Sequence, residues 1–206
     1  MASKKSQIPI SFTPPFLLVL AISLLIIPLK WLLSWLFTAL VHELFHYGAL
    51  CICRSSVLSV TVGFGGARIC TEPLSEWKEC FCALAGPVGG LLLLVFAPVA
   101  PTLAVCAFFQ SVYNLLPIYP MDGGRVLFSL IRQIFKATTA ETVIKIWTWA
   151  ILICIAAVCL WFAVSWGLGP IPIVVAGILV FQNKKSLANS RTNEYNGIVM
   201  YPIGNG

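Results

Sequence analysis

Both histidines of the chain lie in one short stretch, His42-Glu43-Leu44-Phe45-His46. On a helix, residues four apart share a face, so both imidazoles can reach one tetrahedral metal ion such as zinc. The neighbouring Glu43 can then accept a proton from a water molecule that the metal activates. The spacing is that of the helical HExxH motif, and it predicts a hydrolytic zinc site with His42 and His46 as ligands and Glu43 as general base.

This motif lies within an apolar segment, residues 31–50, that is long enough to cross a bilayer. At ~1.5 Å per helical residue, His42 lies ~16 Å into a hydrocarbon layer of ~30 Å. Histidine and glutamate are costly at such a depth, so their presence there indicates a functional site. We therefore expect the metal site to lie inside a membrane.

The composition excludes an ordinary soluble domain. The 206 residues are 59% hydrophobic and 10% charged, and the mean hydropathy is +0.95. We expect an all-α, polytopic bundle of about six transmembrane helices. The expected spans are residues 13–29, 31–50, 81–97, 102–116, 143–165 and 170–182.

The positions of the basic residues indicate an orientation. If both termini are cytoplasmic, twelve of the thirteen Lys and Arg residues face the cytoplasm and only Lys30 lies outside. The active site would then lie in the cytoplasmic half of the bilayer. Lipid headgroups account for the net charge of +6, so the lipid bilayer is an expected partner and nucleic acid is not.

The segment after the second span has the pattern of strands. Apolar residues alternate with small or polar ones over residues 58–64, and Gly65-Gly66 can form a tight turn. We expect a short membrane-associated β-hairpin or sheet after the second helix. It could pair with an extended substrate or be an ordinary connection, and the sequence leaves both open.

A catalytic zinc site normally has three protein ligands, and the only aspartate, Asp122, is the leading candidate for the third. Pro117 and Pro120 prevent a regular helix before it, and Gly123-Gly124 permits a close backbone approach. Irregular backbone at membrane depth is tolerated where it lines a cavity.

Other roles for the carboxylates stay open. Asp122 could instead cap an amphipathic helix over residues 125–135 at the membrane interface. Glu72, Glu76, Glu79 and Glu141 fall in polar loops, where we expect them to be solvated.

Together, HELFH at 42–46 and N-x-x-P-x-x-x-φ-D-G-G at 114–124, where φ is apolar, resemble the motifs of the site-2 protease family of intramembrane zinc metalloproteases. The resemblance covers residues 29–135 and is to the small form without a PDZ or CBS domain. It implies that His42, His46 and Asp122 bind Zn²⁺ and that Glu43 is catalytic. It also implies a transmembrane protein substrate, cut to release a regulatory factor into the cytoplasm, and a multi-pass protein of a bacterial cell membrane.

Two further elements bear on the resemblance. Asn114 could donate a hydrogen bond to the substrate carbonyl or oxyanion, or it could bond between helices. The stretch Ala85-Gly86-Pro87-Val88-Gly89-Gly90 is similar to the family's Gly-Pro element, with Gly90 where the family commonly has asparagine. Small residues at these positions would allow close helix packing.

We expect residues 1–182 to form the integral membrane metalloprotease domain, and residues 183–206 a short polar cytoplasmic tail. All eight cysteines are assigned to packing. The alternatives to a protease are a non-catalytic membrane scaffold homologue and a metal transporter. A scaffold would be expected to lose Glu43, and a transporter to show internal repeats and further ligands.

Overall fold

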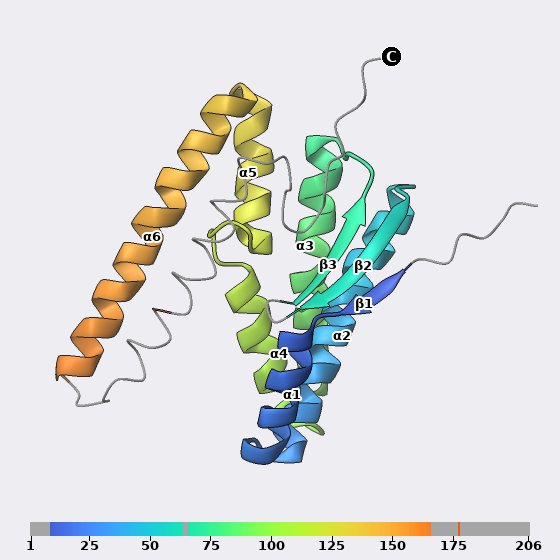
Figure 1. Ribbon diagram of the computed structural model, residues 1–206, viewed down its shortest axis with the longest axis vertical. Coiled ribbons are helices and arrows are strands. Elements are labelled where there is room, and N and C mark those ends of the chain that lie inside the picture. The colour runs from blue at the N-terminus through green and yellow to red at the C-terminus, as the bar shows by residue number, and fades with distance from the viewer. Residues whose placement is uncertain (1–8, 64–65, 166–176, 178–206) are drawn as a thin grey trace, which may run out of the picture.

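The computed structural model describes residues 9–63, 66–165 and 177, and in this part it contains helices and one small sheet (Figure 1). The helices are α1 (Pro14–Ile26), α2 (Leu29–Ile52), α3 (Glu76–Leu92), which continues as the 3₁₀ helix η1 (Leu93–Phe96), α4 (Pro101–Asn114), α5 (Asp122–Ile134) and α6 (Ala137–Ser165). The strands are β1 (Ile10–Phe12), β2 (Val57–Gly63) and β3 (Gly66–Thr71).

Within residues 9–63 and 66–165, three stretches of helix are long and apolar enough to cross a membrane: α2, α3 with η1, and α6. The shorter apolar helix α1 has 13 residues, and α4 has 14. Five of the six expected spans therefore coincide with helices. The sixth, 170–182, lies outside the described residues except for residue 177, so the count of six crossings stays a prediction.

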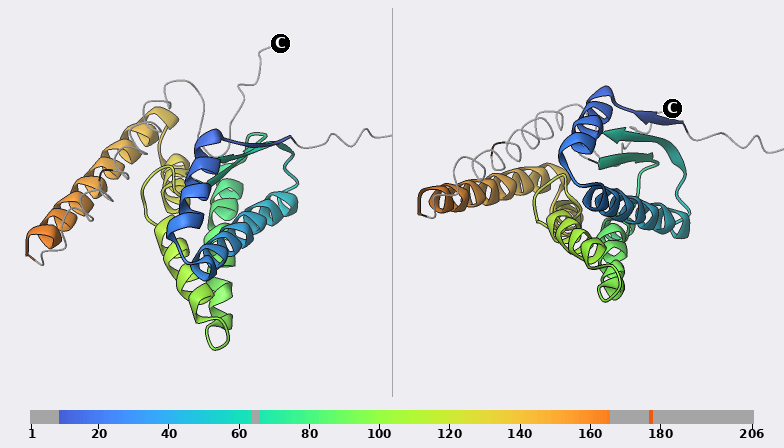
Figure 2. Two further views of the ribbon diagram at one scale, coloured as in Figure 1. Left: turned by 60° about the horizontal axis from the view of Figure 1, so that its bottom comes forward. Right: turned by 90° about the horizontal axis from the view of Figure 1, so that it is seen from below.

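Helix α3 lies at the centre, against α2, α4 and α5. The views in Figure 2 show α2, α3 and α4 gathered together, while α6 leaves the neighbourhood of α5 and extends away from the other helices. Buried residues of α3 include Gly86, Gly89 and Gly90, so at these positions the helix presents backbone to its neighbours. Small residues of this kind allow helices to approach closely in a membrane.

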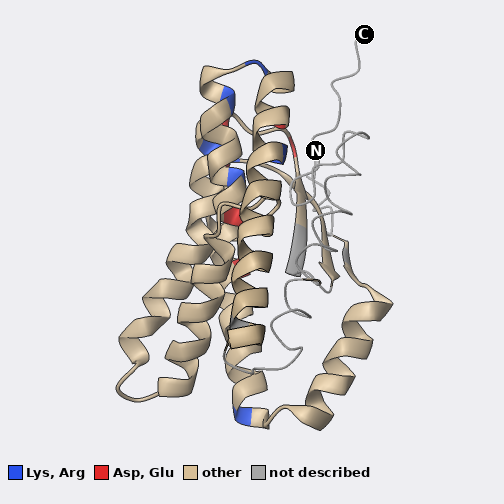
Figure 3. Ribbon diagram, turned by 90° about the vertical axis from the view of Figure 1, so that its left-hand side faces the viewer, with Lys and Arg blue, Asp and Glu red and all other residues tan. Residues whose placement is uncertain are grey.

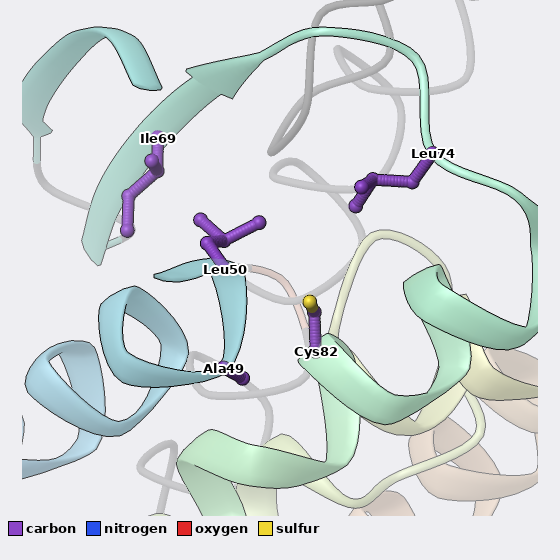
Figure 4. Close-up of a cluster of buried hydrophobic side chains, with 5 residues drawn as sticks. All are labelled: Ala49, Leu50, Ile69, Leu74 and Cys82. Carbon is purple, nitrogen blue, oxygen red and sulfur yellow. The ribbon is translucent and has the colours of Figure 1, made fainter. Parts of the chain in front are cut away.

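The sheet has the order β1-β2-β3. Strands β2 and β3 form an antiparallel hairpin between α2 and α3, and β1 pairs in parallel with β2. A cluster of buried side chains joins β3 to α2 and α3 (Figure 4): Ala49, Leu50, Ile69, Leu74 and Cys82. The sheet is thus packed onto the C-terminal part of α2, and its position relative to a membrane stays a prediction.

Charged residues gather toward one end of the helices (Figure 3), and long stretches without charge follow. A basic residue also marks the opposite end of the bundle. This separation is what a polytopic chain needs, because charge is costly in the hydrocarbon layer. Which end faces the cytoplasm stays a prediction.

Helix α6 holds the loop between α4 and α5. Its buried residues Ala140, Ile144, Thr148 and Leu152 recur every four residues and so form one stripe. Ile118 packs against Leu152, and Tyr119 packs against Ala140 and Ile144. The backbone N–H of Tyr119 donates a hydrogen bond to Oγ1 of Thr148 at 3.2 Å. The loop that leads into Asp122 is therefore fixed from outside by α6.

We expect Ile118→Ala to lower the free energy of unfolding in detergent by about 2–5 kcal/mol, because Ile118 is fully buried and the loop cannot close the resulting cavity. The matched control is Ile134→Ala, whose side chain is 77% exposed at the end of α5. Thermal or denaturant unfolding followed by circular dichroism measures both. Equal stability of the two variants would contradict the role given to the loop.

Candidate metal centre

The two histidines project from the same face of α2 toward α3. His42 is 4% and His46 8% exposed, and their Nε2 atoms lie 3.0 Å apart. A spacing of four residues on a continuous 24-residue helix produces this juxtaposition. Two nitrogen donors thus meet at one point inside the helical bundle.

Asp122 reaches the same point from α5. Its Oδ2 atom lies 3.1 Å from Nε2 of His42 and 3.3 Å from Nε2 of His46. Asp122 is the first residue of α5, so this helix begins three residues earlier than expected, and no side chain caps it. The carboxylate points at the histidines of α2, and the capping role considered for it is not observed.

Gly123 and Gly124 make this placement possible. A Cβ atom at Gly123 would collide with the carbonyl oxygen of Leu115, and one at Gly124 would collide with the backbone of Ile118 and Tyr119. The first turn of α5 therefore lies directly on the backbone of the proline-containing loop. This contact sets where the helix starts and, with it, where Asp122 lies.

The three atoms have the chemistry and the spacing of one face of a zinc site. Two imidazole nitrogens and a carboxylate oxygen are typical zinc ligands, and bonds of about 2.0–2.1 Å in a tetrahedron separate ligands by about 3.3 Å. The observed separations are 3.0, 3.1 and 3.3 Å. In the described part of the chain, these residues form the group able to hold a metal ion.

Gly86 of α3 provides the space beside the two imidazoles. A Cβ atom there would collide with Nε2 and Cε1 of His46 and would lie 2.7 Å from Nε2 of His42. No residue with a side chain fits this position while the two nitrogens keep their places. Gly86 was expected to serve helix packing, and the structure shows that it borders the candidate metal centre.

Nδ1 of His46 donates a hydrogen bond of 2.7 Å to the backbone carbonyl of Cys82. In the neutral ring this bond puts the proton on Nδ1 and leaves the Nε2 lone pair for a metal. Nδ1 of His42 is buried and has no hydrogen-bond partner among the described residues. Only His46 is therefore fixed by a hydrogen bond to α3.

Asp122 is held in its anionic form. The guanidinium of Arg125, whose Nη1 lies 3.5 Å from Oδ1 of Asp122, stabilises the charged carboxylate. An ionised carboxylate is the form that binds a metal ion.

The other two expected site residues are less tightly placed. Glu43 is half-buried on α2, close enough to His46 for its charge to act on that imidazole. Asn114 is the half-buried last residue of α4, just before the loop that leads to Asp122. Their roles stay predictions.

Two charged residues close to Asp122, Glu79 and Arg125, were not among the expected site residues. Glu79 was assigned to a solvated loop, but α3 begins at Glu76 and buries Glu79 to 7% exposure, and Glu76 is half-buried. Arg125 of α5 is also buried, 3.5 Å from Asp122. Ser75 followed by acidic residues is a helix-start signal that could have placed Glu76 and Glu79 on a helix.

We expect Gly86→Ala to weaken Zn²⁺ binding about 10- to 100-fold, because overpacking typically costs about 1–3 kcal/mol and here the clash falls on the ligand nitrogens. Gly48→Ala on α2 is the matched control, since its Cβ would meet nothing within 4 Å. Competition with a chromophoric chelator measures both affinities. Wild-type affinity in Gly86→Ala would show that the imidazoles bind metal elsewhere.

Part of the sequence and the fold resemble known proteins. Residues 96–158 match the profile of Peptidase family M50, a segment that includes Asn114 and Asp122. No curated protein matches the sequence. The fold is similar to that of a site-2 protease from Methanocaldococcus jannaschii, with a TM-score of 0.62 and 20% identity over 90% of this chain and 94% of that one. The profile match agrees with the peptidase family that the sequence motifs indicate, and the structural match shows a shared fold.

Proposed function

We propose that this protein is an intramembrane zinc endopeptidase. It would cleave a peptide bond in or near a transmembrane segment of a membrane-bound regulatory protein and release a factor into the cytoplasm. The convergence of His42, His46 and Asp122 on one point carries the proposal. These residues come from α2 and α5, which are far apart in the sequence, and α2 is apolar enough to span a membrane.

In this mechanism His42, His46 and Asp122 would hold the zinc ion. When bound, zinc would act as a Lewis acid that makes water nucleophilic near neutral pH and polarises the scissile carbonyl. Glu43 would take the proton from the attacking water and pass it to the leaving amine. Asn114 would donate a hydrogen bond to the carbonyl oxygen as negative charge develops there.

The position of the donors within α2 supports a membrane-embedded substrate. A soluble peptide would have no reason to enter the hydrocarbon layer, whereas a transmembrane segment already lies there. Its scissile bond must first be unwound, because a helix hydrogen-bonds its own carbonyl groups. With the metal in the cytoplasmic half and both termini inside, the released fragment would leave toward the cytoplasm.

A metal transporter or an inactive scaffold homologue would need a different set of residues. A transporter should offer further ligands along a pathway, but the described residues include one group able to hold a metal. A scaffold has no need of a glutamate beside the first ligand, and Glu43 is present. Both observations favour the protease.

We expect Glu43→Gln to keep its zinc but to cleave a transmembrane model substrate about 10²- to 10⁴-fold more slowly, which is the usual contribution of a general base. Asp122→Ala should lower the zinc affinity more strongly, because it removes a ligand. Loss of a residue that only supports a ligand typically costs roughly 10- to 100-fold in affinity. Glu72→Gln, at an exposed site between β3 and α3, is the matched control. Zinc content and cleavage by detergent-purified protein are measured on the same samples.

Cleavage by Glu43→Gln at the rate of the control would remove Glu43 as the base. Full zinc content in Asp122→Ala would remove Asp122 from the ligands. A wild-type protein that binds zinc but cleaves none of a panel of transmembrane substrates would favour the scaffold or the transporter.

A further inference from the structure

A second cluster of charge lies directly behind the candidate metal centre. Arg125 of α5 is 9% exposed and Glu79 of α3 is 7% exposed. Nε of Arg125 lies 3.9 Å from Oε1 of Glu79, and Nη1 of the same guanidinium lies 3.5 Å from Oδ1 of Asp122. Burying charged side chains in a largely apolar chain is unfavourable in free energy, so their presence here indicates a functional role.

The two oxygens of Asp122 have different surroundings. Oδ2 faces Nε2 of both histidines, and Oδ1 faces the guanidinium of Arg125. A carboxylate that binds a metal through one oxygen can rotate unless its other oxygen is held. A residue that contacts this second oxygen orients the ligand and affects how tightly the metal binds.

Charge balance explains why Arg125 comes with a partner. A guanidinium alone would repel a divalent cation bound at the neighbouring residues, and the repulsion would be strong because little water screens it. Oε1 of Glu79 lies 3.9 Å from Nε of the same guanidinium, so the carboxylate offsets its charge. Arg125 can therefore hold Asp122 while the Arg125–Glu79 pair adds no net positive charge.

We propose that Arg125 is a positioning residue for Asp122, and that Glu79 anchors Arg125 and neutralises it. The inference rests on the proposed zinc site and adds to it the residues that set the direction of its carboxylate ligand. Arg125 acts through Asp122 and takes no part in proton transfer.

The same two helices carry a matched ion pair that lacks this role. Nη2 of Arg132 lies 3.0 Å from Oε1 of Glu76, so this pair also joins α5 to α3. Both side chains are more exposed, at 22% and 23%. If Arg125 merely fastened α5 to α3, the shorter outer pair should affect the centre at least as strongly.

The test compares Arg125→Gln, Glu79→Gln and Arg132→Gln in the full chain, purified in detergent. Zn²⁺ affinity is measured by competition with a chromophoric chelator. The visible absorption bands of the Co²⁺-loaded protein report the geometry of the ligands, and thermal unfolding reports stability.

We expect Arg125→Gln to weaken Zn²⁺ binding about 10- to 100-fold and to change the Co²⁺ bands. Glu79→Gln should also weaken Zn²⁺ binding, because it leaves the guanidinium uncompensated beside the metal. Arg132→Gln should keep wild-type affinity and bands even if its melting temperature falls.

Wild-type Zn²⁺ affinity and Co²⁺ bands in Arg125→Gln would overturn the proposal, and so would equal losses of affinity in Arg125→Gln and Arg132→Gln. If Arg125→Gln does not fold, Glu79→Gln decides, and its wild-type affinity would overturn the charge-balance argument. A wild-type protein without Zn²⁺ affinity would instead remove the proposed function itself.

Discussion

The meeting of one carboxylate oxygen with two imidazole nitrogens is the contact on which the rest of this structure depends. Oδ2 of Asp122 lies within 3.3 Å of Nε2 of both His42 and His46. Helix α2 and helix α5 must converge at one depth for this contact to exist, and α3 lies against both. Gly86 keeps α3 out of the volume that the imidazoles occupy. The bundle can therefore be understood as an arrangement that holds three donor atoms about as far apart as the ligands of a tetrahedral zinc ion.

The cost of placing charge in an apolar chain explains much of the packing around this contact. Helix α5 buries Asp122, Arg125, Phe128 and Ser129, so its inner face is partly polar, while its apolar residue Ile134 is 77% exposed. A helix in a soluble protein typically buries an apolar stripe and exposes its charged residues, whereas α5 buries Asp122 and Arg125 alongside Phe128. The inner charges are offset by neighbours on α2 and α3, and an exposed apolar side chain is compatible with lipid.

The loop before Asp122 is irregular, yet α6 covers it. Thr148 of α6 accepts a hydrogen bond from the backbone N–H of Tyr119, and irregular backbone in a membrane requires such partners.

Local patterns in the sequence predicted the parts of the structure that local chemistry controls. The HExxH spacing placed two imidazoles on one helical face, and two prolines and two glycines predicted the irregular entry to Asp122. The alternation at residues 58–64 predicted strand β2, which runs from Val57 to Gly63.

Contacts between distant segments could not be predicted from such local patterns. Glu79 was expected in a polar loop because Glu76 and Lys78 lie close to it in the sequence. Its burial is explained by its pairing with Arg125, which joins α3 to α5. The third strand of the sheet, β1, has three residues, which is too short for their alternation to predict a strand.

The central claim is that the metal ligands come from α2 and α5 and that none of the eight cysteines takes part. X-ray absorption at the zinc edge of the purified, zinc-loaded protein tests this most directly. The account predicts a shell of nitrogen and oxygen ligands near about 2.0–2.2 Å with the scattering signature of imidazole. A sulfur shell near about 2.3 Å would contradict it, because cysteine would then be bound to the metal.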